Sequence, residues 1–139
     1  MRSTWQLDTL VTVGALLDDR DGDGLPDGLR TRIVIGPRAQ RPEHLAAVDL
    51  AARLGFASLA LELPLVYSHR DPLPASIIPL FVGRPTTVSP TCPARLSGLL
   101  AGLQQGEGLV AVENGPRSAL LVGGSDSTGL AAAVHAATA

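Results

Sequence analysis

Lysine is absent from this chain of 139 residues, and its eleven basic residues, all Arg, are scattered singly along the sequence. Nucleic-acid binding needs clustered cations that neutralise phosphates, so this distribution argues against a nucleic-acid partner. Aromatic residues make up only 3% of the chain, which leaves few rings to stack on bases or sugars. We therefore expect no nucleic-acid function.

Cysteine and long apolar runs are also scarce. Cys92 is the only cysteine, so the chain can form neither an internal disulfide bond nor a cluster of thiolates around zinc. The longest apolar runs, at residues 10–17 and 56–61, are far shorter than the roughly 20 residues that cross a bilayer. We expect no membrane span, and Asp8 interrupts the only stretch that could resemble a signal peptide.

The remaining composition is that of a folded protein. Hydrophobic residues make up 45% of the chain, the net charge is −2 and the mean hydropathy is +0.25. Disordered chains show low hydrophobicity with high net charge, and this length suits one domain with a sizeable core. We expect a single domain over residues 1–139. Its positive hydropathy predicts that a protein partner, a further domain or a second copy covers part of its surface.

Apolar periodicity and turn residues predict alternating strands and helices. Strands are expected at residues 5–17, 29–35, 56–63, 77–82, 109–113 and 118–122, and helices at 42–54, 94–105 and 130–137. The Pro-rich residues 64–75 are expected to form a loop, and Asn114-Gly115 a tight hairpin turn. The order, roughly ββαββαββα, predicts an α/β (α+β) fold with a single mixed sheet and about three helices packed on it.

Two local features of the later helices carry further expectations. Gly98 and Gly102 lie four residues apart in the second helix, where they would let another backbone approach closely. We expect that helix to lie tightly on the sheet or on a partner. Ser125 or Asp126 is expected to cap the last helix, and Cys92 to be buried and structural.

An acidic segment, residues 18–27, separates the first two expected strands. It contains five Asp and one Arg, so its net charge is −4, while the rest of the chain sums to +2. Its pattern is D-x-D-x-D-G-x-x-D, in which alternate side chains on a tight turn can converge on one ion. Calcium takes about six to eight oxygen ligands, which such a loop supplies. The predicted ligands are the side chains of Asp19, Asp21, Asp23 and Asp27 and the carbonyl of Leu25.

The segment resembles the calcium loops of the EF-hand, dockerin and thrombospondin type 3 kind, on Asp19, Asp21, Asp23 and Gly24. The resemblance implies calcium as the bound ion. Arg30 stands where an EF-hand loop carries a bidentate Glu, so we expect a static loop with a dissociation constant on the order of 10⁻⁴–10⁻³ M. Such loops fill where calcium is abundant, which favours an extracellular or periplasmic location. A solvated turn rich in Asp and Gly is the alternative.

A second resemblance covers residues 107–136. A hairpin with an Asn-Gly turn, a strand that ends in Leu-Val-Gly-Gly and an Ala-rich helix are similar to the small α/β accessory domain of hexosaminidases and α-glucuronidases. They are also similar to domains in periplasmic subunits of bacterial cellulose synthesis. These domains are not catalytic, so the resemblance implies an accessory role beside a carbohydrate-active or cell-envelope enzyme.

Together these features predict a non-catalytic domain or small subunit that calcium stabilises and that has a structural or assembly role. The alternative is a small enzyme or ligand-binding protein that uses a cleft between residues 67–71 and the strand-to-helix turn at residues 123–128. The first loop carries varied recognition chemistry in Tyr67, His69 and Arg70. The second precedes a helix, whose free amides can hold an anion.

Overall fold

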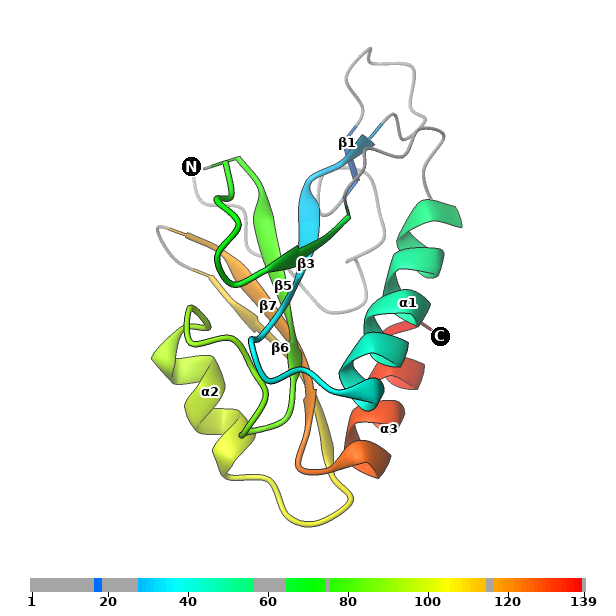
Figure 1. The fold of residues 1–139 in the computed structure, drawn as a ribbon, viewed down its shortest axis with the longest axis vertical. Helices are drawn as coiled ribbons and strands as arrows, with labels where there is room; N and C mark the ends of the chain where they lie inside the picture. The colour runs from blue at the N-terminus through cyan, green and yellow to red at the C-terminus, as the bar shows by residue number, and fades with distance from the viewer. Residues whose placement is uncertain (1–16, 19–27, 57–64, 75, 115–116, 139) are drawn as a thin grey trace.

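A computed structural model of the chain describes residues 17–18, 28–56, 65–74, 76–114 and 117–138 (Figure 1). The strands are β1 (Leu17–Asp18), β2 (Gly28–Leu29), β3 (Thr31–Ile35), β4 (Val66–Ser68), β5 (Ile78–Gly83), β6 (Gly108–Glu113) and β7 (Ala119–Gly124). The helices are α1 (Arg41–Phe56), α2 (Ala94–Ala101) and α3 (Ser127–Thr138).

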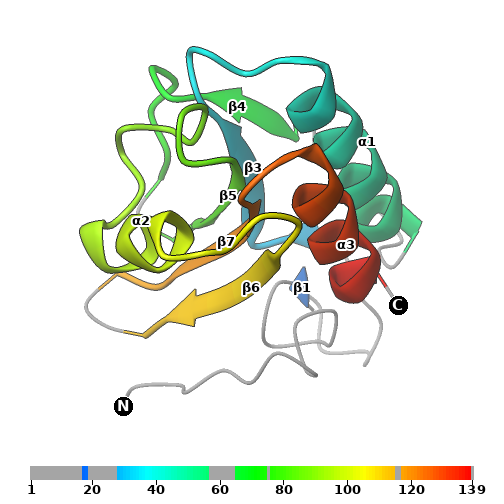
Figure 2. The same cartoon turned by 90° about the horizontal axis from the view of Figure 1, so that it is seen from below.

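The main sheet has five strands in the order β4-β3-β5-β7-β6. β4, β3, β5 and β7 run parallel to one another, and β6 pairs antiparallel with β7 as a hairpin. Helices α1 and α3 lie side by side on one face, and α2 lies on the other (Figures 1 and 2). The prediction of an α/β fold with one mixed sheet and three helices is confirmed.

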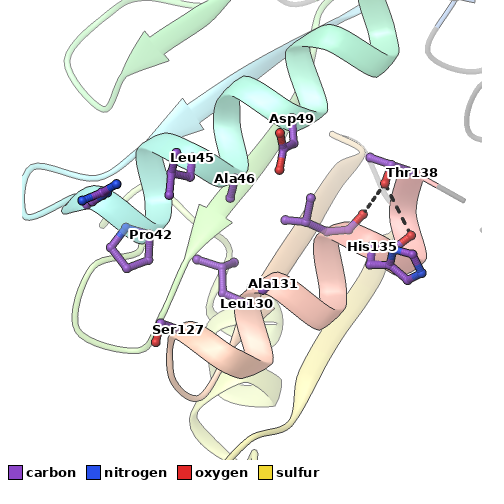
Figure 3. Close-up of a pocket in the computed structure, with 11 residues that line it drawn as sticks. Pro42, Leu45, Ala46, Asp49, Ser127, Leu130, Ala131, His135 and Thr138 are labelled. Atoms are coloured by element: carbon purple, nitrogen blue, oxygen red, sulfur yellow. Dashed lines mark hydrogen bonds between the residues drawn. The ribbon is translucent and has the colours of Figure 1, made fainter.

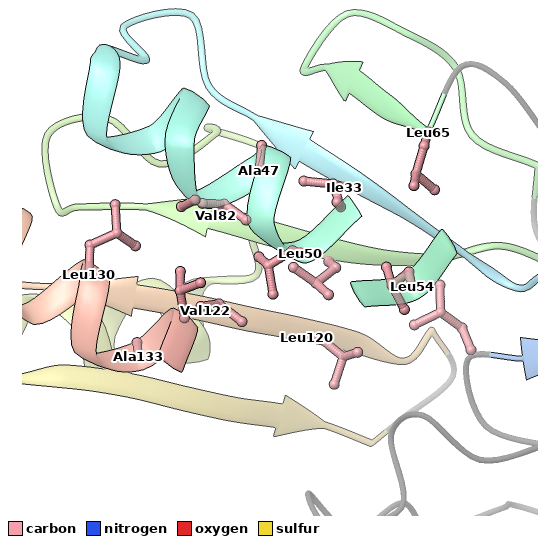
Figure 4. Packing of buried hydrophobic residues seen from close by; sticks show 14 residues of the cluster. Ile33, Ala47, Leu50, Leu54, Leu65, Val82, Leu120, Val122, Leu130 and Ala133 are labelled. Carbon is pink, nitrogen blue, oxygen red and sulfur yellow. The ribbon is translucent and has the colours of Figure 1, made fainter. Parts of the chain in front are cut away.

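The three central strands are buried on both faces, which explains their almost continuous apolar sequences. Because side chains alternate along a strand, neighbouring residues contribute to two separate cores. Ile33, Val82 and Val122 pack beneath α1 and α3, where Leu50 and Leu130 meet them (Figure 4). The second core lies beneath α2 and contains Val34, Phe81, Cys92, Leu96, Leu100 and Leu121.

One prediction about this fold is wrong. Residues 66–68 are not loop: they form β4, which pairs with β3 through the registers Ile33 with Val66 and Ile35 with Ser68. Three residues are too few to show a period in the sequence, and only the neighbouring edge of β3 makes them a strand.

The close approach expected at Gly98 and Gly102 is not made to the sheet. A Cβ added at Gly98 would meet nothing within 4 Å, and one at Gly102 would meet only its own helix. A close contact with a partner at these glycines stays a prediction.

Other boundaries differ at the ends of elements. α2 ends at Ala101, with Gly102 as its C-cap, rather than near residue 105. The strand expected at residues 29–35 is broken at Arg30 into β2 and β3. The strands expected at residues 5–17 and 56–63 lie almost wholly outside the described residues, and Phe56 is the last residue of α1.

No helix in the described part of the chain is both long and apolar enough to cross a membrane. The longest of them, α1, has 16 residues.

Candidate functional site

The structure describes the base of the acidic segment but not its ligands. Outside the described residues lie Asp19, Asp21, Asp23, Leu25 and Asp27. On either side of them, β1 and β2 pair antiparallel, with Leu17 opposite Leu29 and Asp18 opposite Gly28. The residues that flank segment 19–27 are therefore side by side.

Among the residues that the structure describes, no three side chains of His, Cys, Asp or Glu come together in a way that could hold a metal ion. The histidines are dispersed: His44 is on α1, His69 follows β4 and His135 is on α3.

The carboxyl ends of the central strands are covered by the chain itself. Open α/β sheets usually bind ligands at this edge, where the strand order reverses, and here the order reverses between β3 and β5. The connection from β5 to α2 folds back over this place. A Cβ on Gly83 would lie 2.7 Å from the Cα of Val88, and one on Gly36 would lie 2.9 Å from the amide nitrogen of Ser89. Glycine at both positions allows the connection to pack directly on the strand ends.

A buried ion pair fixes that connection to the start of α1. The Glu43 side chain is fully buried, and the Arg84 side chain is 19% exposed. Arg84 donates from Nε to Glu43 Oε2 at 2.9 Å and from Nη2 to Glu43 Oε1 at 3.1 Å. The Gln40 amide donates to the same carboxylate at 2.9 Å, as in a capping box. Three hydrogen bonds from two residues thus hold this buried carboxylate in place.

The turn before α3 is organised by Asp126, which confirms one of the two predicted caps. Its carboxylate accepts hydrogen bonds from the Gly129 amide at 2.8 Å and the Gly106 amide at 2.9 Å. These bonds, first of all the one from Gly129, hold the pKa of Asp126 below its usual value of 3.8. Ser125 instead contacts the Glu107 carbonyl through its amide and its hydroxyl. The Gly129 amide, one of those that an anion could use at this helix start, is therefore occupied by Asp126.

A pocket of about 360 Å³ lies on the α2 side of the sheet. α2 has eight residues and packs mainly over β6 and β7, so loops line the pocket over β3 and β5. Apolar side chains from the strands and the loop after β4 form part of its lining: Val34, Phe81 and Leu73. The other lining residues come from the end of β4 and the loop after it, from β5, from the segment before α2 and from the start of β7, namely Ser68, His69, Asp71, Pro72, Pro79, Thr91, Pro93, Arg117, Ser118 and Ala119.

Two polar side chains of this pocket could contact a ligand. The Nδ1 atom of His69 is buried and has no hydrogen-bond partner within the described residues. The side chain of Arg117 is exposed and lines the same pocket. This pocket borders one side of the predicted cleft, residues 67–71, but none of its lining comes from the other side, residues 123–128.

A larger open groove of about 670 Å³ separates α1 from α3. Leu45 and Asp49 lie on the side of α1 that faces α3, and Leu130 lies on the opposing side of α3 (Figure 3). Arg41 and His135 contribute to its rim. Sequence reasoning missed this groove because it depends on how two helices pack.

Cys92 is buried in the second core, as predicted. Burial, and secondarily the negative charge of Glu113, raises the pKa of the Cys92 thiol to about 11. The thiol is therefore protonated at neutral pH and is unsuited to nucleophilic chemistry.

Comparison of the chain with protein-family models and with curated proteins found no match. Function is therefore inferred from the residues and their geometry.

The Glu43–Arg84 pair can be tested by a double-mutant cycle. Arg84→Met leaves a buried carboxylate without its partner, so we expect the free energy of unfolding to fall by about 3 kcal/mol. Glu43→Met/Arg84→Met removes both charges and should be more stable than Arg84→Met alone. Urea denaturation measures both. The exposed Arg95→Met is the matched control and should cost less than about 0.5 kcal/mol. A double variant less stable than Arg84→Met would contradict this account.

The Asp126 cap predicts a specific pH dependence. Because its pKa is lower in the folded state than the usual 3.8, the charged carboxylate stabilises the fold above that pH. The contribution is lost as the pH falls through the lower pKa of the folded state. The difference in unfolding free energy between the parent and Asp126→Ala should therefore be largest near neutral pH and shrink in acid. Urea titrations across this range measure it, with Asp126→Asn, a neutral cap, as the control. A difference that does not change with pH contradicts the prediction.

Proposed function

We propose that this chain is a non-catalytic α/β domain or small subunit that binds calcium at residues 19–27 and has a structural or assembly role. The observation that carries the proposal is an alternating Asp-Gly segment that joins two paired strands. Residues 18–27 hold a net charge of −4, and their flanks are held together by the pairing of β1 with β2. Carboxylates crowded in so short a segment repel one another unless a cation neutralises them.

The position of the segment explains how an ion there would stabilise the fold. β2 is separated from the central strand β3 by Arg30 alone, and the Arg30 carbonyl accepts a hydrogen bond from the Ile78 amide at 2.7 Å. An ion bound by the acidic segment would therefore stabilise the start of β3 and its pairing with β5. A ligand that binds only the folded state raises its stability by mass action.

The surface of the molecule supports the assembly role. Leu45 and Val48 on α1 are 54% and 63% exposed, although both are large and apolar. Contiguous apolar surface of this kind marks a protein interface. The resemblance of residues 107–136 to accessory domains supports a place beside a carbohydrate-active or cell-envelope enzyme, where calcium is abundant.

Calcium binding is tested by calorimetry and by thermal unfolding. Calcium at about ten times its dissociation constant should stabilise the chain by about 1.4 kcal/mol, and a chelator should reverse this. Asp21→Ala/Asp23→Ala should abolish both the heat and the shift. Asp71→Asn, which alters a carboxylate outside the segment, should keep them. No heat with the unmutated chain would remove the proposal.

A second candidate function is ligand binding, because a specific observation favours it. The pocket of about 360 Å³ over Val34 and Phe81 has a volume typical of small-molecule sites. Its apolar part suits a hydrophobic ligand body, and Arg117 and His69 suit a carboxylate. The site would use the 67–71 loop of the sequence-based alternative, with the start of β7 in place of residues 123–128.

Benzoate is a suitable probe of this pocket, with benzyl alcohol as its uncharged counterpart. If the pocket binds carboxylates, millimolar benzoate should raise the midpoint of thermal unfolding more than benzyl alcohol does. Arg117→Ala should remove the difference, whereas Arg70→Ala, an exposed Arg outside the pocket lining, should retain it. An equal response to both compounds would speak against the ligand-binding function.

A further inference from the structure

The outer surface of α3 lacks the charged residues that usually keep a helix in water. α3 contains no Asp, Glu, Lys or Arg, and Ala131, Ala132 and Ala136 are exposed on it. Beside it, α1 exposes Leu45 and Val48. Surface helices normally present charged or polar residues to solvent, so this pair of helices has a face suited to another protein surface.

The charged residues on this face of α1 lie at equal distances on either side of Leu45. Arg41 precedes Leu45 by four residues and Asp49 follows it by four, and all three line the groove between α1 and α3 (Figure 3). Residues four apart form one ridge along a helix, with a rise of about 6 Å between neighbours. The ridge is thus positive at one end, apolar in the middle and negative at the other end. An antiparallel copy of this ridge therefore presents a negative charge opposite Arg41 and a positive charge opposite Asp49.

We propose that this face binds a second copy of the chain, with the two α1 helices antiparallel across a twofold axis at Leu45. In that arrangement Arg41 of each copy faces Asp49 of the other, and Pro42 of each faces Val48 of the other. Ridges of this spacing pack side by side in the commonest class of helix contact. Symmetric dimers require a patch that is complementary to itself, and charges of opposite sign at equal distances from Leu45 satisfy this requirement.

The groove provides room for the contact. Its open volume of about 670 Å³ lies directly beside Leu45, so the Leu45 side chain of each copy can enter the groove of the other. The exposed alanines of α3 allow close approach there. Charge complementarity favours a second copy over an unrelated partner, because the pattern pairs completely with itself. This dimer would be the assembly that the proposed structural or assembly role requires, so the inference rests on that proposed function.

The symmetry allows a decisive test by charge reversal. Arg41→Glu puts two carboxylates together at both ends of the interface, and Asp49→Arg puts two guanidinium groups together there. Each single variant should raise the dimer dissociation constant by about tenfold or more. Arg41→Glu/Asp49→Arg restores both pairs and should recover dimerisation. An equal mixture of the two single variants should form a heterodimer, since every contact then joins opposite charges.

Sedimentation equilibrium over a concentration series measures these constants. Arg95→Glu, a charge reversal at an exposed position of α2 outside the groove, is the matched control and should dimerise like the parent. Thermal unfolding of each variant checks that it is folded. A chain that stays monomeric at every concentration, or a dimer that neither single reversal weakens, overturns the inference. Sedimentation is measured in calcium and in EDTA. Failure of the dimer is then distinguished from failure of the calcium site, because calcium binding is measured separately by calorimetry.

Discussion

The buried carboxylate of Glu43 is the constraint on which the arrangement of this molecule depends. A charge removed from water must be matched, and Arg84 matches it by reaching back from the far end of β5. The pair fixes the start of α1 to the connection that leads to α2, and glycines at the strand ends let this connection lie on the sheet. The edge where α/β proteins usually hold ligands is consequently filled by the protein's own chain, and the surfaces available for function lie elsewhere.

The groove and the pocket exist because helices cover the two faces of the sheet to different extents. α1 and α3 together cover one face, and their own outer surface is apolar with a groove between them. The other face has only the eight residues of α2, so a pocket remains over β3 and β5. The first surface suits a protein partner and the second a small molecule.

The proposed calcium segment and the proposed dimer act on different parts of one framework. β1 and β2 lead directly into β3, so an ion bound between them would act on the central strands. The dimer face belongs to α1, whose first turn is held by the Glu43–Arg84 pair.

Local sequence patterns determined the elements that local interactions stabilise. Apolar runs, an Asn-Gly turn and an Asp before a helix predicted β5, the β6–β7 hairpin and the α3 cap, because short-range hydrogen bonding and burial decide them. The acidic segment was likewise evident from its charge alone. Only the tertiary structure decided β4, the Glu43–Arg84 pair and both cavities. A three-residue edge strand exists because β3 offers it an unpaired edge, and an ion pair between residues 41 positions apart exists because the sheet brings two distant turns to the same edge.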